Sequence, residues 1–75
     1  MSGDLVYAQK WGRGFVRWDA QVCVDGEWYT LNAYGQTGEW HAEVIGCGTG
    51  AEVGTFRYLA EAKRAAEDWV RERAT

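Results

Sequence analysis

Hydrophobic and polar residues alternate with a period of two through most of the first 45 residues of the chain. This alternation is typical of β-strands that have one buried and one exposed face. It predicts strands at residues 5–11, 15–24, 28–34 and 39–45. Between the second and third of these, the pair Asp25-Gly26 is a strong signal for a two-residue type I′ hairpin. Glycine-containing connections separate the other strands, so the sequence predicts an antiparallel meander.

Two of the predicted strands share the pattern Trp-x-Ala-x-Val, at Trp18–Val22 and again at Trp40–Val44. We interpret the shared pattern as two strands that present the same kind of face to one core. The residues between the apolar positions then point away from that core, as do alternate residues of the strand in between. This outward set comprises Asp19, Gln21, Cys23, Trp28, Thr30, Asn32, Tyr34, Glu39, His41 and Glu43.

The hydrophobic period changes in the last third of the chain. Residues 46–54 are rich in glycine and predict a loop, with a short extended piece at 51–53. From residue 58 to 73 the period becomes 3.6, which predicts a helix with an apolar stripe through Leu59, Ala62, Ala66, Trp69 and Val70. Its opposite face is charged and predicts three exposed i,i+4 ion pairs, namely Lys63–Glu67, Arg64–Asp68 and Glu67–Arg71.

These elements together predict one compact α+β domain over residues 1–75, an antiparallel three- to four-stranded meander packed against one C-terminal helix. The chain is short, and its five Trp, four Tyr and two Phe supply much of the area that it can bury. A single helix covers one face of such a sheet, so we expect function on the uncovered face. Residues 4–11 would hide that face if they lay across it.

The charge pattern favours a basic partner. The net charge is −3, and no Lys or Arg occurs between Trp18 and Phe56. That stretch carries six acids, at Asp19, Asp25, Glu27, Glu39, Glu43 and Glu52, while all eight basic residues lie in the flanks. An acidic sheet attracts basic surfaces and repels phosphate, so direct nucleic-acid binding is not expected. No apolar run suits a membrane span and no signal peptide opens the chain, which predicts a cytoplasmic protein.

The sequence lacks the patterns of catalytic and metal sites. The glycines from Gly46 to Gly50 lack the Lys and Ser/Thr of a phosphate-binding loop. His41 could pair with Cys23 or Glu43 across strands, but no third group is placed to orient such a nucleophile. Two cysteines and one histidine are too few for a zinc site. We therefore expect a binding protein with no enzyme activity, cofactor or metal, and its candidate contacts are Asp19, Trp28, Tyr34, Glu39, His41 and Glu43.

The C-terminal part, Gly54-Thr55-Phe56-x-x-Leu59-x-Glu61-Ala62-x-x-Ala65-Ala66-Glu67-x-Trp69, resembles the arm-type DNA-binding domain of phage tyrosine integrases. The resemblance spans residues 16–72 and implies three antiparallel strands followed by a helix. Members of that family place the sheet in a DNA major groove through basic and polar residues. Here Asp19, Glu39 and Glu43 depart from that pattern. The alternative function that this resemblance implies is a DNA-binding module, which would need Arg13, Arg17, Arg57 and Arg64 to gather on one surface.

In size, acidity and architecture the chain is also similar to small phage-encoded anti-CRISPR proteins and related inhibitors of bacterial defence. These proteins share no sequence motif, so the resemblance assigns no residue. Many of them bind the basic nucleic-acid channels or subunit interfaces of a CRISPR effector complex. The resemblance implies a phage inhibitor that acts in the bacterial host cell and blocks recognition of target DNA. A homodimerising domain, with the outward aromatic residues buried between two copies, is a further alternative to a monomer.

Overall fold

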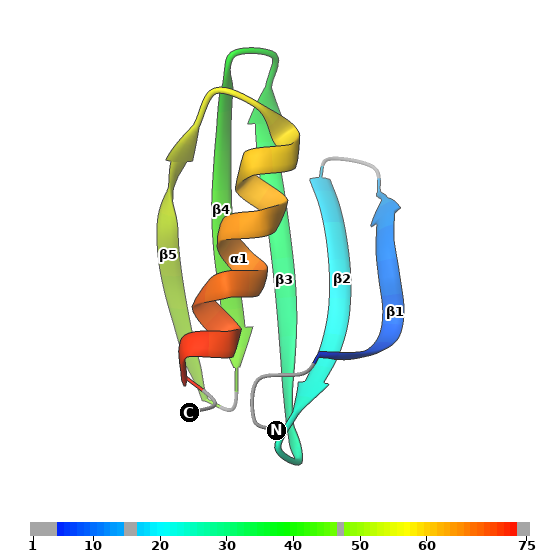
Figure 1. Ribbon diagram of the computed structural model, residues 1–75. Coiled ribbons are helices and arrows are strands. Elements are labelled where there is room, and N and C mark those ends of the chain that lie inside the picture. The colour runs from blue at the N-terminus through cyan, green and yellow to red at the C-terminus, as the bar shows by residue number, and fades with distance from the viewer. Residues whose placement is uncertain (1–4, 15–16, 47, 74–75) are drawn as a thin grey trace.

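A computed structural model describes residues 5–14, 17–46 and 48–73, which form five strands and one helix (Figure 1). The elements are β1 (Val6–Arg13), β2 (Arg17–Val24), β3 (Glu27–Gln36), β4 (Glu39–Gly46), β5 (Thr49–Phe56) and α1 (Leu59–Arg73). The strands make one antiparallel sheet in the order β1-β2-β3-β4-β5. The α+β class, the meander and the C-terminal helix are therefore confirmed, and residues 15–16 of the predicted second strand lie outside the described residues.

The fifth strand, β5, is where the sequence prediction of a loop is wrong. Its residues pair with β4 from Gly46↔Thr49 to Trp40↔Phe56, so the predicted three to four strands become five. Its glycines interrupt the alternation of hydrophobic and polar residues that would predict a strand. A register shift in the middle of the strand also leaves Val53 as an extra residue without a partner position in β4. A β-carbon at Gly54 would lie 3.2 Å from the Phe56 ring, so glycine leaves room for that ring.

The hairpin between β2 and β3 has the predicted turn. Asp25 and Gly26 have φ angles of 52° and 83°, and a type I′ turn requires positive φ at both positions. The turn fixes a register in which Ala20 faces Leu31, and Leu31 in turn faces Val44 of β4. The Trp, Ala and Val side chains of both Trp-x-Ala-x-Val segments therefore lie on the same face of the sheet, in the two strands that flank β3.

The core lies between that face and α1, which packs against β3, β4 and β5 (Figure 1). Ala62, Ala66 and Val70 of the helix are fully buried, and small side chains allow the helix to approach the sheet closely. The sheet contributes the other buried apolar residues, namely Ala20, Val22, Val24, Leu31, Ala33, Ala42 and Val44. Aromatic side chains, among them Trp18, Trp40, Phe56 and Trp69, pack around this centre.

Strand β1 extends the sheet beside β2 and does not lie across the face opposite α1. Its Tyr7 and Trp11 side chains reach the helix instead. The described part of β1 thus leaves the second face of the sheet uncovered. Within the described residues, no helix is both long and apolar enough to cross a membrane.

Candidate binding surface

The face of the sheet turned away from α1, called the outer face from here on, carries all six candidate contacts. Strand alternation and register place there Asp19 from β2, Trp28 and Tyr34 from β3, and Glu39, His41 and Glu43 from β4. The register also places on this face residues that the sequence analysis did not choose as contacts: Arg17, Gln21, Cys23, Thr30, Asn32, Ile45, Glu52 and Thr55. The outer face divides into a histidine cluster, an acidic row and an apolar hollow.

The histidine cluster lies at the β3–β4 turn end of the sheet. The rings of Tyr34 and His41 face each other across the two strands, with centroids 5.2 Å apart and planes inclined by 24°. The Nδ1 atom of His41 is 3.2 Å from the Thr55 hydroxyl and 3.8 Å from a Glu52 carboxylate oxygen. Its Nε2 atom is 3.5 Å from Glu39. Three of the predicted contacts, Tyr34, Glu39 and His41, are therefore neighbours.

The acidic row crosses four strands next to the histidine cluster and consists of Asp19, Asn32, Glu43 and Glu52 in direct register. Asn32 is 2% exposed although it points to the outer face, and its amide donates to a Glu43 oxygen at 3.3 Å. Glu43 lies directly opposite Glu52 on β5, and like charges in that position destabilise a sheet. Glu43 thus serves the fold through Asn32, while its position opposite Glu52 carries an electrostatic cost.

The apolar hollow lies farther along the sheet, beyond the acidic row. It has a volume of about 360 Å³ and is lined by Gln21, Trp28, Tyr29, Thr30, Ile45 and Gly46. Trp28 is 56% exposed and Ile45 is 43% exposed. Trp28 is six residues from Tyr34 along β3, roughly 20 Å in an extended strand. The two predicted aromatic contacts are consequently separate, and Ile45 could have been found from its alternation with Val44.

A Cys–His pair does not form on the outer face. Cys23 is opposite Trp28 in the register, whereas His41 is opposite Tyr34, at the other end of β3. His41 contacts Tyr34, Thr55 and two carboxylates rather than Cys23 or Glu43. Cys47 lies outside the described residues. In the part of the chain that is described, no group of three or more His, Cys, Asp or Glu side chains is arranged to hold a metal ion.

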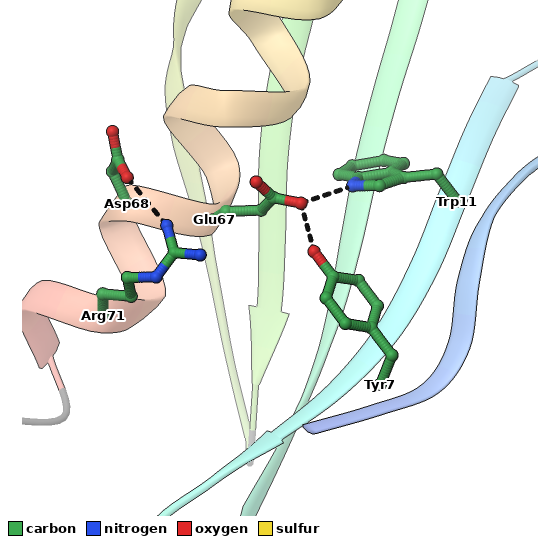
Figure 2. Close-up of polar contacts among 5 residues, drawn as sticks. All are labelled: Tyr7, Trp11, Glu67, Asp68 and Arg71. Carbon is green, nitrogen blue, oxygen red and sulfur yellow. Dashed lines mark hydrogen bonds and ion pairs between the residues drawn. The ribbon is translucent and has the colours of Figure 1, made fainter. Parts of the chain in front are cut away.

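A second polar cluster joins α1 to β1 and β2 on the side of the sheet that the helix covers. Figure 2 shows the part of it in which Tyr7 and Trp11 of β1 contact Glu67 of α1. A Glu67 carboxylate oxygen accepts hydrogen bonds from the Tyr7 hydroxyl and from Trp11 Nε1, the latter at 2.8 Å. The Lys63 ammonium lies 4.0 Å from the centre of the Trp18 ring and 5.6 Å from that of Trp11. These contacts tie β1 and β2 to the helix and serve the fold.

This cluster corrects the predicted charged surface of the helix. Lys63 and Glu67 are half-buried against aromatic rings and do not lie on a solvated face as a simple i,i+4 pair. Arg71 forms an ion pair with Asp68, three residues away, at 3.0 Å (Figure 2). The predicted pairs were Arg64–Asp68 and Glu67–Arg71. The helical period correctly assigned the stripe that meets the core, but it did not show that β1 reaches the helix flank.

We expect the Tyr7–Glu67 contact to make folding stability fall at alkaline pH. Burial, followed by the hydrogen bond and the negative charge of Glu67, raises the pKa of Tyr7 from 10.0 to about 12. Because the folded-state pKa is the higher one, the stabilisation is complete below pH 10 and is lost as the pH rises towards 12. The difference in unfolding free energy between wild type and Tyr7→Phe, measured by urea titration, should therefore shrink across that interval. A difference that does not change with pH would contradict the assignment.

The chain matches no protein-family model, no curated protein and no solved structure. The fold and the site therefore define it only as an α+β protein whose sheet has one face covered by a helix and one acidic, partly aromatic face that is open. Its function has to be inferred from the residues of that open face.

Proposed function

We propose that this chain is a non-enzymatic binding protein whose outer face binds a basic surface of another protein. The acidic row carries the proposal, because Glu43 and Glu52 oppose each other on adjacent strands, and this like-charge pair costs free energy even though Glu43 also holds the Asn32 amide. Basic side chains of a partner would relieve that repulsion on binding. The neighbouring carboxylates of Asp19 and Glu39 extend the negative potential, which would steer such a partner and fix its register.

For the partner, we propose the basic nucleic-acid channel or a subunit interface of a CRISPR effector complex, which the chain would block as a phage-encoded inhibitor. The chain's small size, its net charge of −3 and the concentration of acids on its sheet support this choice. A protein surface that binds DNA phosphates is basic, so it would also attract a row of carboxylates. The same carboxylates weigh against a role as an integrase-type DNA-binding module, since they would repel the phosphates of DNA.

Reversing two exposed charges of the outer face should weaken binding at least about tenfold, since like-charge contacts cost kcal/mol-scale free energy. We choose Glu39→Lys with Glu52→Lys, because both side chains are more than half exposed, whereas Glu43 holds the buried Asn32. Purified effector complex would be mixed with target DNA and increasing amounts of wild type or variant. The gel shift of the DNA then reports how much protein is needed to prevent recognition.

The matched control is Asp68→Lys with Glu72→Lys, which changes the net charge equally at exposed positions of α1. This control should inhibit as wild type does. Equal inhibition by the outer-face variant would contradict the proposal. The partner itself would first be isolated with tagged protein from bacterial lysates that carry defence systems, with and without nuclease. Recovery of nucleic acid that disappears after nuclease would instead favour a DNA-binding module, and dimeric mass in light scattering would favour a homodimerising domain.

A further inference from the structure

We infer that the apolar hollow beside Trp28 is an anchor site for one large apolar side chain on an extended, basic segment of the partner. The inference rests on the proposed function and adds to it the kind of residue that the partner must present. It depends on three features of the outer face: the exposed apolar side chains beside the hollow, the volume of the hollow, and a fixed spacing to the acidic row.

Two large apolar side chains and two polar side chains line the hollow. Trp28 and Ile45 are the large side chains, and both are among the exposed large hydrophobic residues of the described chain. Gln21 and Thr30 line the hollow with groups that can donate and accept hydrogen bonds. Tryptophan is among the residues enriched at the energetic centre of protein interfaces, where it pairs with a pocket on the partner.

Ile45, which lines the hollow, is paired with a glycine on β5. Gly50 is its partner across β4 and β5, and a β-carbon built on Gly50 would meet no atom within 4 Å. The β5 neighbour of Ile45 therefore has no side chain, which leaves Ile45 exposed on that side. A volume of about 360 Å³ holds one large side chain of a partner, which fits an anchor residue better than a whole peptide.

The spacing to the acidic row identifies the occupant as basic. Thr30 and Ile45 are paired in one row of the outer face, and Asn32 and Glu43 are paired in the next row. The two rows are two residues apart along each strand, roughly 7 Å. Side chains two residues apart on an extended peptide have the same separation and the same direction. An apolar residue in the hollow would therefore place a residue two positions away over the carboxylates, where Arg or Lys is favoured.

The charge pattern makes other occupants less suitable. A second copy of this chain would bring its own acidic row close to Glu43 and Glu52, and the like charges would repel. A nucleobase stacked on Trp28 would bring its phosphates to the same carboxylates. An extended Arg-x-Trp-x-Arg segment avoids both conflicts, because it supplies the aromatic anchor and the opposite charge at the required distance.

The test uses a designed peptide, acetyl-Gly-Arg-Gly-Trp-Gly-Arg-Gly-amide, titrated into the isotope-labelled full chain and followed by amide NMR. We expect saturable shifts at the Trp28 indole and at the amides of Thr30, Ile45 and Gly46, with a roughly millimolar dissociation constant. Replacing the peptide's Trp with Gly should weaken binding at least fivefold. Trp28→Ala should remove the shifts, whereas Tyr58→Ala, which deletes a similarly exposed aromatic residue outside the sheet, should leave them unchanged.

The outcomes separate this inference from the proposed function. If the peptide without Trp binds as well as the original, the anchor site is wrong and a basic partner remains supported. If a peptide with Glu in place of both Arg residues binds equally well, the basic partner itself is wrong. Absence of shifts at the hollow would overturn the anchor site. Shifts that depend on protein concentration in the absence of peptide would also overturn it, and they would favour a second copy of this chain as the occupant.

Discussion

Gly35→Ala should lower the free energy of unfolding by about 2–4 kcal/mol, because backbone strain and overpacking each cost about 1–3 kcal/mol. Gly35 has a φ angle of 135°, which residues with a β-carbon rarely adopt. A β-carbon there would collide with the carbonyl oxygen of Glu39 and come within 3.2 Å of Trp40 Cα. Both obstacles are backbone atoms of β4, so relief requires the hairpin to shift. Urea denaturation of the variant measures the loss.

The control is Gly38→Ala in the turn of the same hairpin. Gly38 also has a positive φ, of 90°, but a β-carbon there would meet nothing within 4 Å. Gly38→Ala should therefore lower the free energy of unfolding only by the cost of the left-handed backbone, about 1–2 kcal/mol. Equal losses in the two variants would mean that the close approach of β3 and β4 at Gly35 does not contribute. A larger loss at Gly35 would show that glycine is needed for the close approach of β3 and β4 at that position.

Leu31→Ala should destabilise the fold by about 2–5 kcal/mol, as expected for truncation of a fully buried leucine. Leu31 has no exposed area, and it lies between Ala20 and Val44 in the middle strand of the sheet. Its neighbours are small or held by their strands, so they cannot fill the space that three lost carbons leave. For a domain of this size, the melting temperature should fall by roughly 10 °C or more. Calorimetry or thermal circular dichroism measures the shift.

Ile45→Ala is the matched control for that substitution, because it also removes three carbons from a strand of the same sheet. Ile45 is 43% exposed and belongs to the outer face, so its truncation should cost less than about 1 kcal/mol. A loss as large as that of Leu31→Ala would contradict the separation of the two faces. It would mean that the outer face carries a core of its own, and the hollow beside Trp28 would then be part of the folded structure rather than a docking site.

The sequence predicted β2, β3, β4 and α1 to within a few residues because their hydrophobic periods are uninterrupted. The repeated Trp-x-Ala-x-Val pattern also assigned the two faces of the sheet correctly, and with them the outward direction of all six candidate contacts. Alternation is a local property, so these features can be read without knowing which strands pair.

The remaining features depend on contacts between distant parts of the chain. Strand β5 was missed because glycines and the extra residue Val53 interrupt its alternation, and Glu52 was consequently not chosen as a contact. Lys63 and Glu67 were assigned to solvent because a helical period does not reveal a second neighbour on the helix flank. The grouping within the outer face likewise required the register, which separates Trp28 from Tyr34 and brings Glu43 opposite Glu52.

The Tyr7–Glu67 contact joins residues 60 positions apart, and α1 follows every strand in the chain. On a ribosome, β1 would therefore emerge long before the helix that holds its side chains. Contacts of such high sequence separation form late because the loop between them must close first. We expect the β1 edge of the nascent sheet to remain accessible to chaperones until α1 has been synthesised.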